Sequence, residues 1–148
     1  MRAFWMAGYL LLSIVTAGAL RADLQTVKAE PNLEKRSKLA MENADRALKE
    51  ARAAYAKGDF KQTEMLVAEV QESVELAETS LRETGKNPRK SPKWFKRTEI
   101  ETRDLLRKLD SFRDEMSVVD RPPVERAIAK IQHIHDELLS GVMEGKSK

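Results

Sequence analysis

The sequence has 148 residues, which fits a single domain; 34% of them are charged and 41% are hydrophobic. That composition suits a helical protein with a narrow apolar seam and a wide solvated face. The sequence contains no cysteine, which excludes disulfide bonds and zinc sites built on thiolates.

The N-terminus has the features of a secretory signal peptide, which we assign to residues 1–22. Arg2 provides a positive start, and an uncharged apolar run follows at residues 3–20. Small residues then supply Ala-x-Ala-type cleavage positions after Ala19 or after Ala22. We therefore expect a periplasmic or secreted protein. An uncleaved inner-membrane anchor formed by residues 3–20 stays open, because this run just reaches spanning length.

Residues 23–31 have no clear period, and we expect a flexible lead there. From Leu33 to Lys57 the pattern is helical, with Asn32 as the N-cap. The apolar seam of this helix is narrow and rich in alanine, so the helix needs a neighbour to bury it. The seam consists of Met41, Ala44, Leu48, Ala51 and Tyr55, flanked by Ala40, Ala47 and Ala54.

A short turn separates this helix from the next. Gly58 can adopt the left-handed conformation that ends a helix, and Asp59 can cap the helix that follows. The second helix runs from Phe60 to about Thr84, and Gly85 stops it. So short a turn predicts that the two helices are antiparallel. The second seam consists of Val67, Val70, Val74, Ala77 and Leu81.

Two proline-containing joints organise the rest of the chain. Ser91 as N-cap and Pro92 at the first helical position predict a third helix, which fades at Ser117. Asp120 is expected to cap a fourth helix, and residues 144–148 are expected to be a disordered tail. The third and fourth seams consist of Phe95, Thr102, Leu105, Leu109, Phe112 and Met116, and of Val124, Ile128, Ile131, Ile134, Leu138 and Val142.

Four amphipathic helices joined by short turns predict an all-α, antiparallel four-helix bundle over residues 32–143. The bundle would be built from two long helical hairpins, with coiled-coil-like seams. Hairpins that pack side by side, or that swap between chains, are the alternative architecture.

Residues 54–60, Ala-Tyr-Ala-Lys-Gly-Asp-Phe, resemble the helix–turn–helix junction of a tetratricopeptide repeat. The likeness stops there, because Thr63 stands where that repeat has alanine and no second copy follows. It implies the same turn chemistry and not membership of that family.

A second resemblance covers the segment Ser91 to Arg97 together with Glu99-Ile100, Thr102-Arg103, Leu105-Leu106-Arg107 and Leu109-Asp110. With these residues, the chain resembles a group of exported bacterial helical proteins of no assigned function. The resemblance implies export and a helical fold, and it transfers no active-site residues.

No constellation of residues indicates catalysis, a cofactor or a metal. His133 and His135 are the two histidines, and on a helix they point to different faces, so we expect surface or half-buried side chains. The sequence has no nucleophile motif and no glycine-rich phosphate loop. We therefore expect a non-catalytic interaction or structural module, with homo-oligomerisation left open.

One segment is strongly charged. Residues 86–97 contain six basic residues and no acid, whereas residues 23–85 and 98–148 have net charges of −3 and −2. Without residues 1–22 the net charge is only +1, so we expect no nucleic-acid binding. The candidate binding residues are Lys86, Arg89, Lys90, Lys93, Trp94, Phe95, Lys96 and Arg97.

Two explanations account for this segment. Cations near a helix N-terminus oppose the helix dipole by about 0.3–1 kcal/mol each. An intramolecular offset would come from the end of the second helix, with Glu75, Glu78 and Glu83. The functional explanation is an unknown partner, either an acidic protein or an anionic membrane or envelope surface. Trp94 and Phe95 would then lie at the boundary of that surface.

Overall fold

A computed structural model describes residues 17–144, and every regular element in this range is helical. The all-α prediction is therefore confirmed for the described residues. The elements are α1 (Ala17–Lys28), α2 (Leu33–Ala56), α3 (Phe60–Glu83), α4 (Pro92–Glu115), the 3-10 turn η1 (Val118–Asp120) and α5 (Pro122–Met143).

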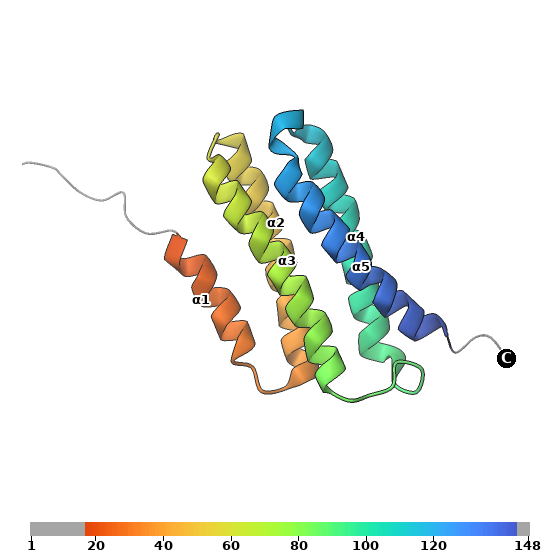
Figure 1. The fold of residues 1–148 in the computed structure, drawn as a ribbon. Helices are drawn as coiled ribbons and strands as arrows, with labels where there is room; N and C mark the ends of the chain where they lie inside the picture. Colours follow the sequence, from red (N-terminus) through yellow and green to blue (C-terminus); the bar gives the residue numbers. More distant parts are fainter. Residues whose placement is uncertain (1–16, 145–148) are drawn as a thin grey trace, which may run out of the picture.

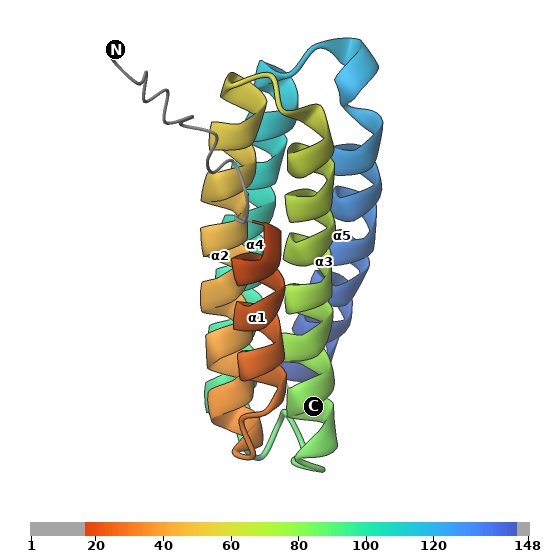
Figure 2. The same cartoon turned by 90° about the vertical axis from the view of Figure 1, so that its left-hand side faces the viewer.

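The four long helices form two hairpins that lie against each other (Figure 1). Helix α2 packs mainly on α3 and α4 mainly on α5, while α2 also lies beside α4 and α3 beside α5. The turn at residues 57–59 and the connection at residues 116–121 lie at one end, which we call the tip end (Figures 1 and 2). Residues 84–97, where α3 passes into α4, lie at the opposite end, which we call the basic end.

Local sequence signals set the helix boundaries as expected. The Asn32 side-chain oxygen accepts a hydrogen bond from the Lys35 backbone N–H at 2.9 Å, which caps α2. Gly58 has φ +75°, a conformation that costs glycine little and that ends α2. Asp59 then caps α3 by accepting from the Gln62 backbone N–H at 3.1 Å. The predicted caps at Asn32 and Asp59 are confirmed.

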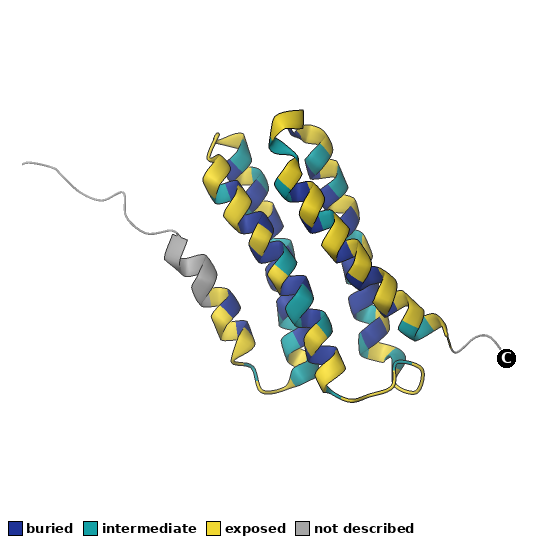
Figure 3. Ribbon diagram, viewed as in Figure 1, coloured by how far each residue is buried: buried dark blue, intermediate teal, exposed yellow. Residues whose placement is uncertain are grey.

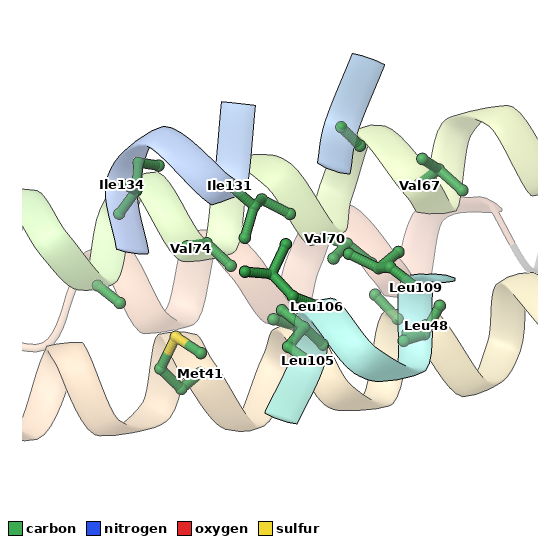
Figure 4. Close-up of a cluster of buried hydrophobic side chains, with 14 of the residues drawn as sticks. Met41, Leu48, Val67, Val70, Val74, Leu105, Leu106, Leu109, Ile131 and Ile134 are labelled. Atoms are coloured by element: carbon green, nitrogen blue, oxygen red, sulfur yellow. The ribbon is translucent and has the colours of Figure 1, made fainter. Parts of the chain in front are cut away.

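The core lies between the two hairpins, where the inward faces of all four long helices are buried and the outward faces are exposed (Figure 3). Helix α2 contributes mainly alanines, which let α3 approach closely, and α3 contributes valines. Helices α4 and α5 supply larger side chains that fill the space left by the alanines (Figure 4). The labelled core residues are Met41, Leu48, Val67, Val70, Val74, Leu105, Leu106, Leu109, Ile131 and Ile134.

The flexible lead expected at residues 23–31 is corrected by the structure for residues 23–28, whereas residues 29–31 connect two helices. Helix α1 continues to Lys28 and lies against α2 and α3 (Figure 2). Its side chains Leu24 and Val27 are buried. Asp23 also pairs with Arg46 at 3.4 Å. Two apolar residues three positions apart are too few to show a period, so only the tertiary contact reveals this helix.

The expected cap of the fourth helix is also corrected. Asp120 lies in η1, and α5 begins after Arg121 without a side-chain cap. The Asp120 carboxylate instead accepts a hydrogen bond from the Tyr55 hydroxyl at 3.0 Å. Tyr55 is far away in sequence, and local spacing therefore could not indicate this bond.

Three predictions fall wholly or partly outside the described residues. The signal peptide at residues 1–22 overlaps them only through α1, which includes Ala19 and Ala22. The anchor alternative at residues 3–20 overlaps them only from Ala17 onward, and the tail at residues 144–148 only at Glu144. No helix within residues 17–144 is both long enough and apolar enough to cross a membrane.

Candidate functional site

The predicted basic segment lies at the basic end, partly in the α3–α4 connection and partly in the first turns of α4. Pro92 starts α4 as predicted, but the Ser91 side chain makes no capping hydrogen bond. The segment therefore enters α4 with positively charged side chains and no acidic residue in the first turn. Residues with exposed side chains here are Lys86, Arg89, Lys90, Lys93 and Lys96.

The two aromatic residues belong to the fold. Phe95 is buried in the core, and Trp94 is half-buried and packs against it. The Lys93 ammonium and the Arg97 guanidinium lie 5.5 Å and 5.6 Å from the Trp94 ring centroid, within cation–π range. The structure therefore places Trp94 as a support for these cations, and it leaves Phe95 no exposed face for a ligand.

Two cations of the segment have carboxylate partners. Lys86 pairs with Glu34 of α2, and the Arg97 Nε lies 2.9 Å from Glu101, one turn further along α4. The first pair connects the segment to α2, the second lies within α4, and both neutralise part of the segment's charge locally.

The carboxylates expected to balance the remaining cations are engaged elsewhere. Glu83 pairs with Arg36 of α2, and Glu78 accepts from Arg82 on its own helix. Glu75 accepts a hydrogen bond from Gln71 at 3.0 Å. The intramolecular offset predicted from the sequence is therefore wrong in its choice of partners.

Four cations consequently have no carboxylate partner among the described residues: Arg89, Lys90, Lys93 and Lys96. We call these four residues the unpaired cluster. Lys93 and Lys96 also lie in the first turns of α4, where the helix dipole is positive. Like charges within eight residues repel each other, and an anion bound nearby would relieve both effects.

A buried hydrogen-bonded pair that the sequence did not predict lies between α4 and α5. His135 Nε2 is 2.9 Å from the Glu99 carboxylate, and both side chains are almost fully buried. The sequence did contain a signal for their burial. Glu99 lies four residues after Phe95, and His135 lies four residues after Ile131, so both fall on the apolar faces of their helices. The expectation of surface or half-buried histidines holds for His133, whose side chain is exposed, and is wrong for His135.

A second buried polar cluster lies between α2 and α3. The Asn43 amide donates to Glu69 at 3.0 Å and to Ser73 at 2.9 Å. Arg46 approaches the same Glu69 oxygen at 3.4 Å. Burial raises the pKa of the Glu69 carboxyl above its usual range, and the hydrogen bond from Asn43 opposes that shift only in part.

Replacing Glu69 with glutamine should stabilise the protein at neutral pH. A raised pKa means that Glu69 supports folding below its unfolded-state pKa and loses that contribution as pH rises through the folded-state pKa. Glu69→Gln keeps an acceptor for Asn43 and removes the buried charge. We expect the free energy of unfolding to rise by on the order of 1 kcal/mol at pH 7. This gain should vanish near pH 3, where the Glu69 carboxyl is protonated in both states. Urea denaturation at the two pH values measures it. The exposed Glu64→Gln is the control, and a loss of stability at pH 7 would contradict the prediction.

The described residues contain no group of three or more side chains of the metal-binding types placed to hold a metal ion. Comparison with known protein families, with curated proteins and with solved structures finds no match for this chain. The unpaired cluster and its surroundings are therefore interpreted from their own geometry.

Proposed function

We propose that this chain is a non-catalytic, exported helical interaction module whose basic end binds anionic surfaces of the bacterial envelope. The single observation that carries the proposal is the unpaired cluster, four cations in eight residues without a carboxylate partner in residues 17–144. A surface ion pair contributes little to stability, so leaving these four cations unpaired costs the fold little while keeping them available to an external anion.

The bundle gives this cluster a rigid base. We infer that the two hairpins form an antiparallel four-helix bundle, in which α4 holds Lys93 and Lys96 one turn apart. The half-buried Trp94 fixes the orientation of α4 at its first turn, and Lys93 lies over its ring. Preorganised charges lose less conformational entropy on binding than charges on a mobile tail.

The expected contact with a phospholipid surface is peripheral. Phe95 is buried and Trp94 is partly covered by Lys93 and Arg97, so neither ring is free to enter the acyl region. Binding would then depend on charge alone, at about 1 kcal/mol for each basic residue close to an anionic bilayer. The aromatic contribution considered from the sequence is not part of this proposal.

Vesicle binding tests the proposal. The protein should co-sediment with vesicles of phosphatidylcholine and phosphatidylglycerol in a 3:1 ratio and not with vesicles of phosphatidylcholine alone. Since the Debye length falls from about 10 Å at 0.1 M salt to about 3 Å at 1 M, binding should weaken steeply as salt is added. Equal binding to both vesicle types, or binding that salt does not change, would refute a charge-driven contact.

Export is the second part of the proposal, and it rests on the sequence of residues 1–22. We infer a periplasmic or secreted protein cleaved after Ala19 or Ala22. Cell fractionation followed by mass spectrometry of the purified chain should find a new N-terminus at one of these two positions. An intact Met1 in the membrane fraction would instead favour the anchored form.

A further inference from the structure

The tip end, opposite the unpaired cluster, carries an apolar groove between α3 and α5. Two adjoining hollows of about 210 Å³ and 140 Å³ share Glu64, Val67 and Pro123 in their linings. The larger hollow is mainly apolar, and the smaller one extends it along α3 and α5. We call the two hollows together the tip groove. Its apolar lining residues are Val67, Pro123, Tyr55, Phe60, Ala68, Met116, Val119, Val124 and Ala127, and its polar ones are Thr63, Glu64, Gln71, Asp120 and Arg126.

Two adjacent exposed valines lie at the tip end: Val119 lines the tip groove, and Val118 precedes it in η1. Val118 and Val119 are 73% and 84% exposed, and Phe60, which also lines the groove, is 55% exposed. We call Val118 and Val119 the valine pair. No residue of η1 is buried, so the fold gains no core packing from these two side chains. Adjacent exposed aliphatic side chains beside an apolar hollow are typical of an interaction surface.

The turn that carries the valine pair is held in place by specific bonds. The Tyr55 hydroxyl donates to Asp120 at 3.0 Å and accepts from the Ser117 backbone N–H at 3.0 Å. The Arg121 guanidinium donates to the Met116 carbonyl at 3.1 Å. Tyr55 itself packs edge-on against Phe60, with centroids 5.5 Å apart. The valine pair is therefore presented in a fixed position, which lowers the entropic cost of docking.

Charge decides which end of the molecule a second copy can approach. Residues 57–64 contain two basic and two acidic residues, and so do residues 117–126, giving both tip segments a net charge of zero. Residues 86–97 contain six basic residues and no acid. Two copies would repel each other at their basic ends, whereas their tip ends meet without net repulsion and can exchange opposite charges across the contact.

We propose that the tip end is a two-fold symmetric dimer interface in which the valine pair of each copy packs on the tip groove of the other. A two-fold axis makes the same patch serve both subunits, and that requires a projecting element and a hollow on one surface. The tip end has both. The apolar surface is small, which puts this interface at the low end of the size range and makes the dimer concentration-dependent.

Sedimentation velocity on the protein tests the dimer. The full coding sequence is expressed, and the chain is purified in the form that cells accumulate. Between about 10 μM and 1 mM, the weight-average mass should rise from one chain towards two. The double variant Val118→Asp, Val119→Asp should weaken association at least about tenfold, because it brings acidic groups together at the axis. The matched control is Ile100→Asp, Leu139→Asp, which changes two exposed apolar residues of α4 and α5.

Cross-linking gives an independent readout. The chain has no cysteine, so Val118→Cys under mild oxidation should yield a single disulfide-linked dimer, while Ile100→Cys should not. A mass that stays at one chain over the whole concentration range overturns the proposal, because a second copy then does not bind the tip groove. A dimer that persists in the Val118→Asp, Val119→Asp variant also overturns it, because the copies then associate through another surface. Vesicle binding plays no part in either measurement.

Discussion

Replacing the unpaired cluster with glutamine should reduce binding to anionic vesicles by about three orders of magnitude. Arg89→Gln, Lys90→Gln, Lys93→Gln and Lys96→Gln together remove four charges from the basic end. Each basic residue near an anionic bilayer contributes about 1 kcal/mol, and about 1.4 kcal/mol corresponds to a tenfold change in affinity. The fold should be unaffected, because all four side chains are exposed and make no ion pair with the described residues.

A matched variant separates position from net charge. Lys57, Lys61, Arg126 and Lys130 are also three lysines and one arginine, are exposed, and have no carboxylate partner in residues 17–144. They lie on the tip end and along α5, away from the basic end. Their replacement with glutamine should change vesicle affinity by less than about tenfold. Equal losses in the two variants would show that binding follows overall charge, and would contradict a dedicated site.

Local signals predicted most of the helix boundaries because each boundary depends on residues close in sequence. Asn32 and Asp59 cap helices through their own side chains, and Gly58 and Gly85 adopt positive φ where α2 and α3 end. The seams were also predictable, since the 3.6-residue period places their residues on one face. The exceptions are Tyr55, Ile128 and Val142, which are half-buried and pack against the core.

Features that depend on distant residues were not predictable in this way. Helix α1 is stabilised by the burial of Leu24 and Val27 where it packs on α2 and α3. Asp120 accepts a hydrogen bond from Tyr55, which lies 65 residues away in the sequence. The prediction of which carboxylates balance the basic segment was wrong for the same reason, because Glu83 pairs with Arg36, 47 residues away in the sequence. A sequence pattern identifies which residues can pair, whereas the packing of the helices decides which of them do.

In the candidate site, too, the features set by local sequence were predictable and those set by helix packing were not. The sequence located the cations and the start of α4 correctly, since both are local. It offered Trp94 and Phe95 as candidate contacts for a partner, and the structure places Phe95 in the core and Trp94 beneath Lys93 and Arg97. Aromatic residues at a helix start can cover the end of a core or face a partner, and only the neighbouring helices distinguish these cases.

Replacing Phe112 with alanine should produce the largest loss of stability from a single core side chain. Phe112 is the largest of the fully buried side chains, at 1% exposure. It joins the hairpins through Tyr55, with ring centroids 5.9 Å apart, and through Arg52, whose guanidinium lies 5.7 Å from its ring centroid. We expect Phe112→Ala to cost about 3–5 kcal/mol, because a cavity is left where α4 meets α2. Urea denaturation followed by circular dichroism measures this.

The size of this loss follows from what the core otherwise contains. Helix α2 buries mostly alanine, and these small side chains cannot rearrange to fill the cavity that the loss of Phe112 leaves. A loss of this size is at least about a fifth of a total stability of about 5–15 kcal/mol, and the midpoint in urea would shift accordingly. Ile100→Ala, at an exposed position of the same helix, should stay within about 0.5 kcal/mol of the original protein. A loss below about 1 kcal/mol for Phe112→Ala would mean that the hairpins do not depend on this contact.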